Sequence, residues 1–253
     1  MIQNPMDMKG AVVLVTGASS GIGRETAIVL SQLNARLIIT GRDQVRLAQT
    51  LEQLEGTGHR VEPFDLENTD AIPKWLRSIV DRADPLGGLA HCGGLIHLLP
   101  VQYLNTAKFE TLMRTNVTSA VMLVKAFRAR GCAVRGSGVV LVSSMAAFDG
   151  DAGLSAYAAG KAALIGFARS AARELVADGL RVNCVAPAII KGELLDRVGQ
   201  DTGPEHVERL RQRHPMGFGE ARDVAYAIAY LLAETGRWIT GSTLEIDGGY
   251  SLR

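Results

Sequence analysis

Residues 11–23 read AVVLVTGASSGIG, and this stretch decides the fold. The mostly β-branched run 11–16 predicts a buried strand, and a helical pattern begins at about residue 24, just past the glycines. Glycines allow a tight turn and close approach of backbone amides to a bound group, and a helix N-terminus favours an anion. The GxxxGxG spacing in this context predicts a dinucleotide site. An ATPase-type phosphate loop is excluded, because Arg24 follows Gly23 where that loop needs lysine.

The rest of the chain repeats the alternation of strand and helix. After the strand at 11–16, further strands are predicted at 36–40, 60–66, 88–92, 139–144, 180–186 and 242–247. Helices are predicted at 24–34, 44–54, 75–82, 106–130, 155–177 and 221–234. Strands that are apolar throughout, with helices between them, indicate a parallel sheet covered on both faces. We therefore expect a single-domain, doubly wound α/β fold over 10–253, with a flexible arm at 1–9 and a substrate lid at 188–219.

Composition excludes several classes of function. Apolar residues make up 47% of the chain and charged residues 21%, and the formal net charge is +1. Neither nucleic acid nor a membrane is indicated as a partner, and no apolar run approaches the roughly 20 residues of a membrane span. Three cysteines without a CxxC pair argue against a disulfide framework and a thiolate zinc site, so no metal is expected. The start, MIQNPMDMKG, lacks the apolar core of a signal peptide, and we expect a cytoplasmic protein.

The end of the second strand indicates which dinucleotide is bound. Sites for NAD hold an acid there, whereas an arginine accommodates the 2′-phosphate of NADP. The strand runs into Thr40-Gly41-Arg42 with no acid at its last two positions, so NADP(H) is favoured over NAD(H). Asp43 keeps the NAD alternative open, because it is either a helix cap or an acid that serves the ribose.

Tyr157 and Lys161 lie one turn apart on the predicted helix 155–177 and so share a face. Hydride transfer to a carbonyl leaves an alkoxide that needs a proton, and the reverse reaction needs a base. Lowering the pKa of a tyrosine by about three units takes about 4 kcal/mol of phenolate stabilisation. We expect the Lys161 ammonium to supply much of this and to hold a ribose hydroxyl. Ser144, at the end of the fifth strand, is expected to donate to the developing oxyanion, whereas Ser143 points to the other face.

Several motifs together resemble the short-chain dehydrogenase/reductase family over about residues 10–250. They are TGASSGIG, Asn116, Ser144, the segment Tyr157–Lys161 and ITGSTLEIDGG, and the resemblance is closest to the 3-oxoacyl-(acyl carrier protein) reductases of the family. It implies a seven-stranded Rossmann sheet and a tetrad of Asn116, Ser144, Tyr157 and Lys161, in which Asn116 holds a water that links the lysine to solvent. The cofactor contacts that we expect are Gly17, Ser19, Ser20, Gly21, Ile22, Gly23, Arg42, Asp65, Leu66, Cys92, Gly93, Gly94, Tyr157, Lys161, Pro187 and Ile190.

The resemblance also implies a homotetramer whose interfaces use the helices at 106–130 and 155–177. Small side chains on the second helix permit the close approach that such an interface needs. The alanines concerned are Ala158, Ala162, Ala163, Ala168 and Ala172.

Two segments depart from the pattern of the family. The fourth strand ends in His91-Cys92-Gly93-Gly94 where the family has Asn-Asn-Ala-Gly, and His91 is expected to be a hydrogen-bonded core residue that replaces the lost side-chain bonds. It is not expected to be a metal ligand, because no second ligand lies at metal spacing. Pro187-Ala188 replaces Pro-Gly, and Gly192 replaces a threonine that helps to hold the cofactor. Cofactor affinity or the order of the lid is expected to be lower as a result.

The leading functional hypothesis is NADPH-dependent reduction of a ketone to a secondary alcohol, with a 3-oxoacyl thioester as one substrate class. The alternatives are an NAD(P)-dependent dehydrogenase of a sugar, cyclic polyol or steroid-like alcohol, and a dinucleotide-binding sensor without turnover. For the former, His97, Asp149 and Asp151 are candidate hydroxyl ligands. An acyl carrier is an open partner, since Asp178 stands where carrier-specific reductases have a basic residue and leaves Arg135 and Arg173 as candidate contacts.

Overall fold

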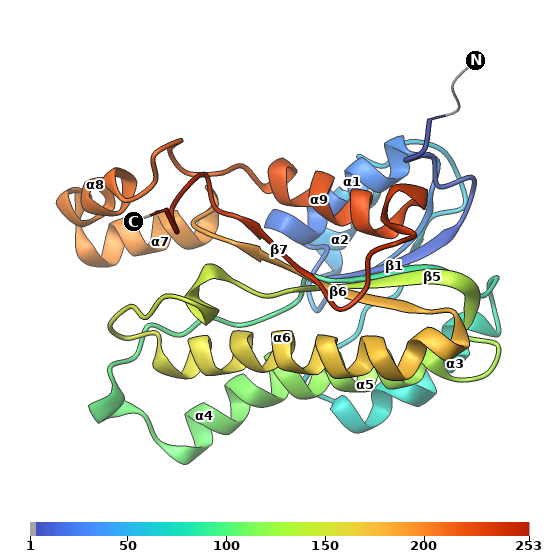
Figure 1. The fold of residues 1–253 in the computed structure, drawn as a ribbon, viewed down its shortest axis with the longest axis horizontal. Coiled ribbons are helices and arrows are strands. Elements are labelled where there is room, and N and C mark those ends of the chain that lie inside the picture. The colour runs from blue at the N-terminus through green and yellow to red at the C-terminus, as the bar shows by residue number, and fades with distance from the viewer. Residues whose placement is uncertain (1–3, 253) are drawn as a thin grey trace.

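The computed structural model describes residues 4–252, and a seven-stranded parallel sheet forms its centre (Figure 1). The strand order is β3-β2-β1-β4-β5-β6-β7. The strands are β1 (Val12–Thr16), β2 (Arg36–Thr40), β3 (Arg60–Val61), β4 (Leu86–His91), β5 (Ala133–Val142), β6 (Arg181–Pro187) and β7 (Thr243–Ile246). The order reverses between β1 and β4, and dinucleotides bind at such a switch point, beyond the carboxyl ends of the strands. The predicted doubly wound Rossmann fold is confirmed.

Helices cover both faces of the sheet, with α3 to α6 on one side and α1, α2 and α9 on the other (Figure 1). Their bounds are α1 (Gly21–Gln32), α2 (Gln44–Leu51), α3 (Ile72–Val80), α4 (Thr106–Met113), α5 (Ser119–Arg128), α6 (Ser155–Leu175), α7 (Glu193–Thr202), α8 (Pro204–Gln212) and α9 (Ala221–Leu232). None of the helices among residues 4–252 is long and apolar enough to cross a membrane.

Two hydrophobic cores, one on each face, explain why the strands are apolar throughout. Leu14 of β1 packs in the core that contains Phe127 of α5. Its neighbour Val13 packs in the other core, with Leu30 of α1 and Ile228 of α9. Because successive side chains of a strand point to opposite faces, a strand covered on both sides needs apolar residues at every position.

The third strand is shorter than the predicted 60–66. In the structure the strand ends at Val61, two residues before Pro63. Backbone bonds from Glu62 to Ile39 and from Phe64 to Gly41 nevertheless keep the segment alongside β2. The predicted path of residues 60–66 along β2 is therefore right, although the regular hydrogen bonding between the two strands is interrupted.

The helix predicted at 106–130 is divided by a π-helical turn, Arg114–Thr118, between α4 and α5. The lid at 188–219 is also more regular than predicted, because it contains α7 and α8. These two helices lie together at one end of the molecule, next to the C-terminus (Figure 1).

The flexible arm expected at 1–9 falls partly on residues 1–3, which lie outside the described residues. Within its remainder, the Met8 side chain is only 7% exposed and packs in the core beside α1. The Met8 amide donates to the Leu33 carbonyl, and the Gly10 amide donates to that of Asn34. This part of the expected arm is therefore packed against the domain.

Candidate active site

The glycine-rich turn joins β1 to α1 and fits an anionic group. Ser20 is the N-cap residue of α1, but its side chain makes no capping bond, and the first turn holds no acidic residue. The turn is tight as well, because a Cβ on Gly17 would lie 2.7 Å from the Gly93 amide nitrogen and one on Gly23 would overlap the Gly17 carbonyl. A Cβ on Gly21 would meet nothing within 4 Å. Uncapped amides beside this open position suit the diphosphate of a dinucleotide.

The segment after β2 carries Arg42 and no acidic side chain that is free to bind a ribose. The Arg42 side chain is 62% exposed and lies 3.7 Å from Glu67. Asp43 caps α2, since its carboxylate accepts from the Arg46 amide at 3.0 Å. The Asp65 carboxylate accepts from the amide of Glu67 at 3.0 Å, so Arg42 and Asp65 flank the same residue. Asp43 therefore has the role of a helix cap, the first of its two readings.

Arg24 is not free to reach a ligand beside Arg42. Its guanidinium donates to the Ser19 carbonyl at 2.5 Å and to the Thr50 hydroxyl at 3.1 Å. These bonds hold the glycine-rich turn against α2.

The segment 92–94 contacts the glycine-rich turn on one side and the loop after β3 on the other. A Cβ on Gly93 would lie 2.8 Å from the Leu66 side chain. The Cys92 thiol is part-buried, and burial raises its pKa to about 12, so it stays protonated at neutral pH. Pro187 ends β6 beside Ile246, and Ile190 bridges to Gly219 within the lid. These predicted cofactor contacts all lie at or beyond the carboxyl edge of the sheet.

His91 is a core residue, as the sequence predicts. Its side chain is 1% exposed, and its Nδ1 lies 2.8 Å from the Thr16 hydroxyl. That hydroxyl accepts from the Gly93 amide at 3.2 Å, so its own proton is free to donate to Nδ1. The Nε2 proton then faces the Ser119 hydroxyl at 3.5 Å, which itself donates to the Thr115 carbonyl. Burial lowers the pKa of His91 to about 3, so the ring is neutral.

Asn116 lies in the π-helical turn and fixes the segment that follows Gly94. Its carboxamide oxygen accepts from the Leu95 amide at 2.6 Å, and its nitrogen donates to the Leu95 carbonyl at 2.8 Å. A Cβ on Gly94 would lie 3.1 Å from the Asn116 oxygen and 3.4 Å from Lys161 Nζ. The geometry therefore brings Asn116, Gly94 and Lys161 together.

Ser144, Tyr157 and Lys161 meet where β5 ends and α6 begins. The Lys161 ammonium is 5% exposed and donates to the Val142 carbonyl at 2.7 Å. The Ser143 hydroxyl donates to the Lys161 carbonyl at 2.8 Å, so it points away from the site, as predicted. These two bonds fasten α6 to the end of β5. They place Ser144 within hydrogen-bond reach of Tyr157.

The electrostatics differ from the prediction at one point. Burial raises the pKa of Tyr157, and the hydrogen bond with Ser144 offsets part of that rise. The Lys161 ammonium lies 5.5 Å from the centre of the Tyr157 ring, and burial lowers the pKa of Lys161 to about 8. The expected lowering of the tyrosine pKa by the lysine is therefore wrong for the chain by itself. Removing a phenol from water disfavours its anion more than this cation stabilises it.

Residues around this site that the sequence did not reveal are Arg213 and Tyr250, which bind Asp149 and Asp151. No local pattern marks them, because the partners are tens of residues apart in the chain. Among residues 4–252, no group of three or more histidine, cysteine, aspartate or glutamate side chains is arranged to hold a metal.

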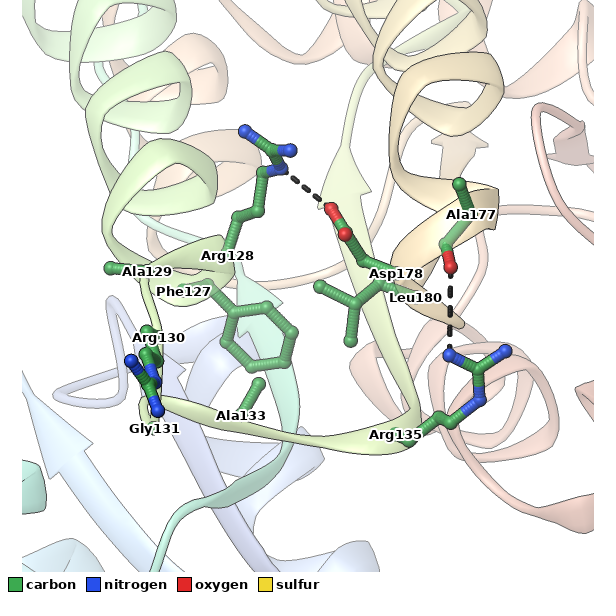
Figure 2. A pocket seen from close by; sticks show the side chains of 10 residues that line it. All are labelled: Phe127, Arg128, Ala129, Arg130, Gly131, Ala133, Arg135, Ala177, Asp178 and Leu180. Carbon is green, nitrogen blue, oxygen red and sulfur yellow. Dashed lines mark hydrogen bonds and ion pairs between the residues drawn. The ribbon is translucent and has the colours of Figure 1, made fainter.

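A pocket of about 540 Å³ lies elsewhere, between the end of α5 and the residues after α6 (Figure 2). Arg128 donates to Asp178 at 2.7 Å and Arg135 to the Ala177 carbonyl at 3.5 Å (Figure 2). Tyr157 lies near the start of α6, and Ala177 of the pocket lies just past its end, which is about 30 Å away at the rise of an α-helix. This pocket is therefore remote from the cluster of Ser144, Tyr157 and Lys161.

A Rossmann sheet with an uncapped glycine-rich turn, beside a serine, tyrosine and lysine, defines a nicotinamide-dependent oxidoreductase. A family model described as Enoyl-(Acyl carrier protein) reductase matches residues 17–251. The chain therefore belongs to this family of short-chain NAD(P)-dependent dehydrogenases and reductases.

Individual relatives agree with this assignment. The chain is 31% identical to the 3-oxoacyl-(acyl-carrier-protein) reductase FabG of Vibrio cholerae, over 96% of the chain and 98% of the relative. It is 28% identical to the hydroxy(phenyl)methylsuccinyl-CoA dehydrogenase subunit BbsD of Thauera aromatica, over 98% of the chain and 99% of that protein. Among solved structures, a dehydrogenase/reductase from Sinorhizobium meliloti 1021 superposes with a TM-score of 0.87 at 28% identity, covering 97% of both chains.

Proposed function

We propose that this chain reduces a 3-oxoacyl thioester to the corresponding secondary alcohol, with NADPH as the reductant. The observation that carries the proposal is the meeting of Ser144 and Tyr157 where β5 ends and α6 begins, with Lys161 buried 5.5 Å from the centre of the Tyr157 ring. Two hydroxyls that converge from a strand end and a helix start suit one carbonyl oxygen. The names of the relatives FabG and BbsD each include an acyl thioester with a keto or hydroxyl group, which supports this substrate class.

The glycine-rich turn at 17–23 would hold the dinucleotide, whose chemistry there would be the donation of a hydride to the carbonyl carbon. Ser144 and Tyr157 hold the carbonyl oxygen, and the phenol of Tyr157 gives it a proton as negative charge develops. The raised pKa of Tyr157 keeps the phenol protonated at neutral pH, which suits the reductive direction. Lys161, with a pKa of about 8, is mostly charged at neutral pH, and its positive field stabilises the phenolate that forms when Tyr157 gives up its proton. Asn116 positions the turn at 94–95 beside this lysine.

The preference for NADPH rests on Arg42 and Asp43. The exposed Arg42 guanidinium is available to a phosphate, whereas Asp43 is occupied as the cap of α2. Titration of NADPH and NADH by intrinsic fluorescence tests this preference, and tighter binding of NADH contradicts it.

An alcohol dehydrogenase of the sugar or polyol type is less well supported. The two carboxylates expected to bind hydroxyls, Asp149 and Asp151, are held by Arg213 at 3.2 and 2.8 Å. A carrier protein is likewise not required as a partner. The negative charge of Asp178 neutralises the positive charge of Arg128 in the pocket of Figure 2, so this surface offers less positive charge to a carrier. We infer a small thioester substrate.

We also propose a homotetramer. Of the five alanines of α6 expected at an interface, Ala162 is exposed, and Ala158 and Ala163 are half-buried. Ala168 and Ala172 are 1% and 3% exposed and pack inside the chain, so their expected part in an interface is wrong. Sedimentation velocity decides the oligomeric state. The free thiols of Cys92, Cys132 and Cys184 suit a reducing compartment, and on that ground we place the protein in the cytoplasm.

The decisive experiment measures NADPH oxidation with acetoacetyl thioesters. In Tyr157→Phe we expect kcat to fall about 10³-fold, the size of general acid catalysis, with NADPH binding retained. Tyr226→Phe, which removes an exposed hydroxyl from α9, is the matched control. Full activity of Tyr157→Phe contradicts the mechanism. Turnover of an enoyl thioester in place of the ketone contradicts the substrate class, and cofactor binding without any turnover returns the sensor hypothesis.

A further inference from the structure

Arg213, the first residue after α8, connects three segments that are distant in the chain. It donates to Asp151 at 2.8 Å and to Asp149 at 3.2 Å. It also donates to the Tyr250 hydroxyl, and that hydroxyl donates to Asp149 at 2.9 Å. The guanidinium lies 5.0 Å from the centre of the Tyr250 ring. We call Arg213, Asp149, Asp151 and Tyr250 the Arg213 cluster.

The two aspartates of the Arg213 cluster lie on the segment that joins the two proposed catalytic hydroxyls. Ser144 precedes it and Tyr157 follows it, and both aspartates lie between them. The Tyr250 ring is 6% exposed and packs with Met145, the neighbour of Ser144, and with Ala186 near the end of β6. The cluster therefore borders the place where a carbonyl substrate meets Ser144 and Tyr157.

The loop at 148–154 is held from a second side as well. The Leu99 amide donates to the Gly153 carbonyl at 2.8 Å, which ties it to the segment after β4. On the lid, His214 contacts the Tyr250 ring at 4.8 Å between ring centres. The Ile189 amide donates to the His214 ring at 3.4 Å. The end of the lid, the C-terminal turn and the loop at 148–154 thus form one connected rim.

The strength of this connection comes from the arginine fork. A planar guanidinium can donate to two carboxylates and a hydroxyl at once, and such charge-assisted bonds are stronger than neutral ones. The Arg213 side chain is 30% exposed, so its bonds are screened by solvent less than those of a fully exposed pair. Burial contributes through the Tyr250 ring, whereas the two aspartates remain about 40% exposed and are held by their bonds to Arg213.

We propose that Arg213 determines substrate specificity by fixing this rim, so that the chain prefers short 3-oxoacyl thioesters over long ones. The inference rests on the proposed function and deepens it. In this proposal a long acyl chain reaches the loop at 148–154 and breaks the bonds of the Arg213 cluster, whereas a short one leaves the rim intact. Since the groups involved do not touch the reacting atoms, the preference arises from binding and appears in KM.

The test measures kcat and KM with NADPH for a series of 3-oxoacyl thioesters from acetoacetyl to long-chain. For the wild type we expect kcat/KM to fall with chain length. In Arg213→Ala we expect the ratio of short-chain to long-chain kcat/KM to drop about tenfold, a change of about 1.4 kcal/mol, mostly through KM. Tyr250→Phe keeps the ring and removes the hydroxyl, and we expect a smaller drop in the same direction.

Arg211→Ala is the matched control, because Arg211 lies two residues earlier, in the last turn of α8, and pairs with Glu208 on that helix. We expect its ratio to equal that of the wild type. An unchanged ratio in Arg213→Ala overturns the inference, and so does a loss of the same factor for every chain length at unchanged KM. If Arg213→Ala does not fold, an unchanged ratio in Tyr250→Phe overturns it. A wild type that reduces all lengths equally overturns this inference alone, whereas one that reduces no ketone overturns the proposed function as well.

Discussion

On the cofactor side of the site, the buried residues behind the glycine-rich turn are joined by neutral hydrogen bonds and by close contacts between glycines, although Arg24 also braces the turn from outside. On the substrate side, part-exposed ion pairs connect the segments. Thr16 and His91 are 0% and 1% exposed, and the bond between them contains no charge. On the substrate side, Arg213 and its two aspartates are 30 to 40% exposed. At the other end of the lid, the pair of Arg46 and Glu193 is more exposed still, at 46% and 64%.

This difference indicates which side of the site can change its conformation at the lower cost in free energy. A buried hydrogen bond that is left unmade costs the desolvation of its partner, about 1–3 kcal/mol, and salt does not screen it. An exposed ion pair contributes at most about 1 kcal/mol and is screened by salt. We therefore expect the cofactor side to behave as the rigid part of the site and the substrate side as its adjustable part.

The largest expected effect comes from a substitution that adds a side chain where two glycines of the cofactor side are in close contact. In Gly23→Ala the new methyl group overlaps the Gly17 carbonyl, so the start of α1 must shift away from the turn. We expect a loss of about 3 kcal/mol of unfolding free energy, the upper part of the range for overpacking. Chemical denaturation measures this, and calorimetric titration shows whether NADPH binding is lost as well.

Gly41→Ala is the matched control for stability, because a Cβ there meets its nearest atoms at 3.5 Å, an ordinary contact distance. We expect its unfolding free energy to lie close to that of the wild type. Equal stability of Gly23→Ala and Gly41→Ala contradicts a rigid cofactor side.

The second effect is the pH dependence that His91 confers on stability. Its folded-state pKa of about 3 lies below the ordinary 6.5, so the unfolded chain binds the extra proton as the pH falls through that window. The stability associated with the neutral ring is fully present above about pH 6.5 and is lost toward pH 3, at about 1.4 kcal/mol per pH unit. Removing the titration by His91→Asn is expected to flatten the acid limb of the stability curve, at a cost near neutral pH from the lost bond to Thr16.

Urea denaturation between pH 4 and pH 7.5 gives both curves. His97→Asn serves as the control, since that side chain is exposed. Parallel acid limbs for the wild type and His91→Asn would mean that His91 is not held neutral by its surroundings. In that case another group would cause the loss of stability in acid, and the neutral hydrogen bonds of the cofactor side would not account for it.

The sequence predicted those features of the fold and site that depend on local patterns. The strands follow from runs of apolar residues, and the cap at Asp43 follows from its place before a helical pattern. The neighbourhood of Ser144, Tyr157 and Lys161 follows from a strand end and helical spacing. Each of these needs only a few consecutive residues to be specified.

The features that sequence reasoning missed depend on distant partners or on burial. Arg213 is 62 and 64 residues away from its two aspartates along the chain, and no spacing rule connects them. The pKa of Tyr157 depends on how much water the folded chain excludes, which a motif does not specify. The π-helical turn at Asn116 arises where the carboxamide bonds to both backbone groups of Leu95. The helices α7 and α8 lie in the lid, a segment for which the sequence analysis predicts no helix.

The smallest effect is expected where the lid meets α2. Glu193, in the first turn of α7, accepts from Arg46 at 2.9 and 3.1 Å. In Glu193→Gln we expect hydrogen exchange of the α7 amides to rise a few-fold, because an exposed pair of this kind holds the lid by less than about 1 kcal/mol. High salt should have the same effect on the wild type and little on the variant, since screening weakens the pair that the variant already lacks. Glu208→Gln is the control, because its partner Arg211 lies on the same helix and does not join the lid to α2. A fall in global stability as large as that of Gly23→Ala would show that the lid is part of the rigid structure, and the contrast between the two sides would then fail.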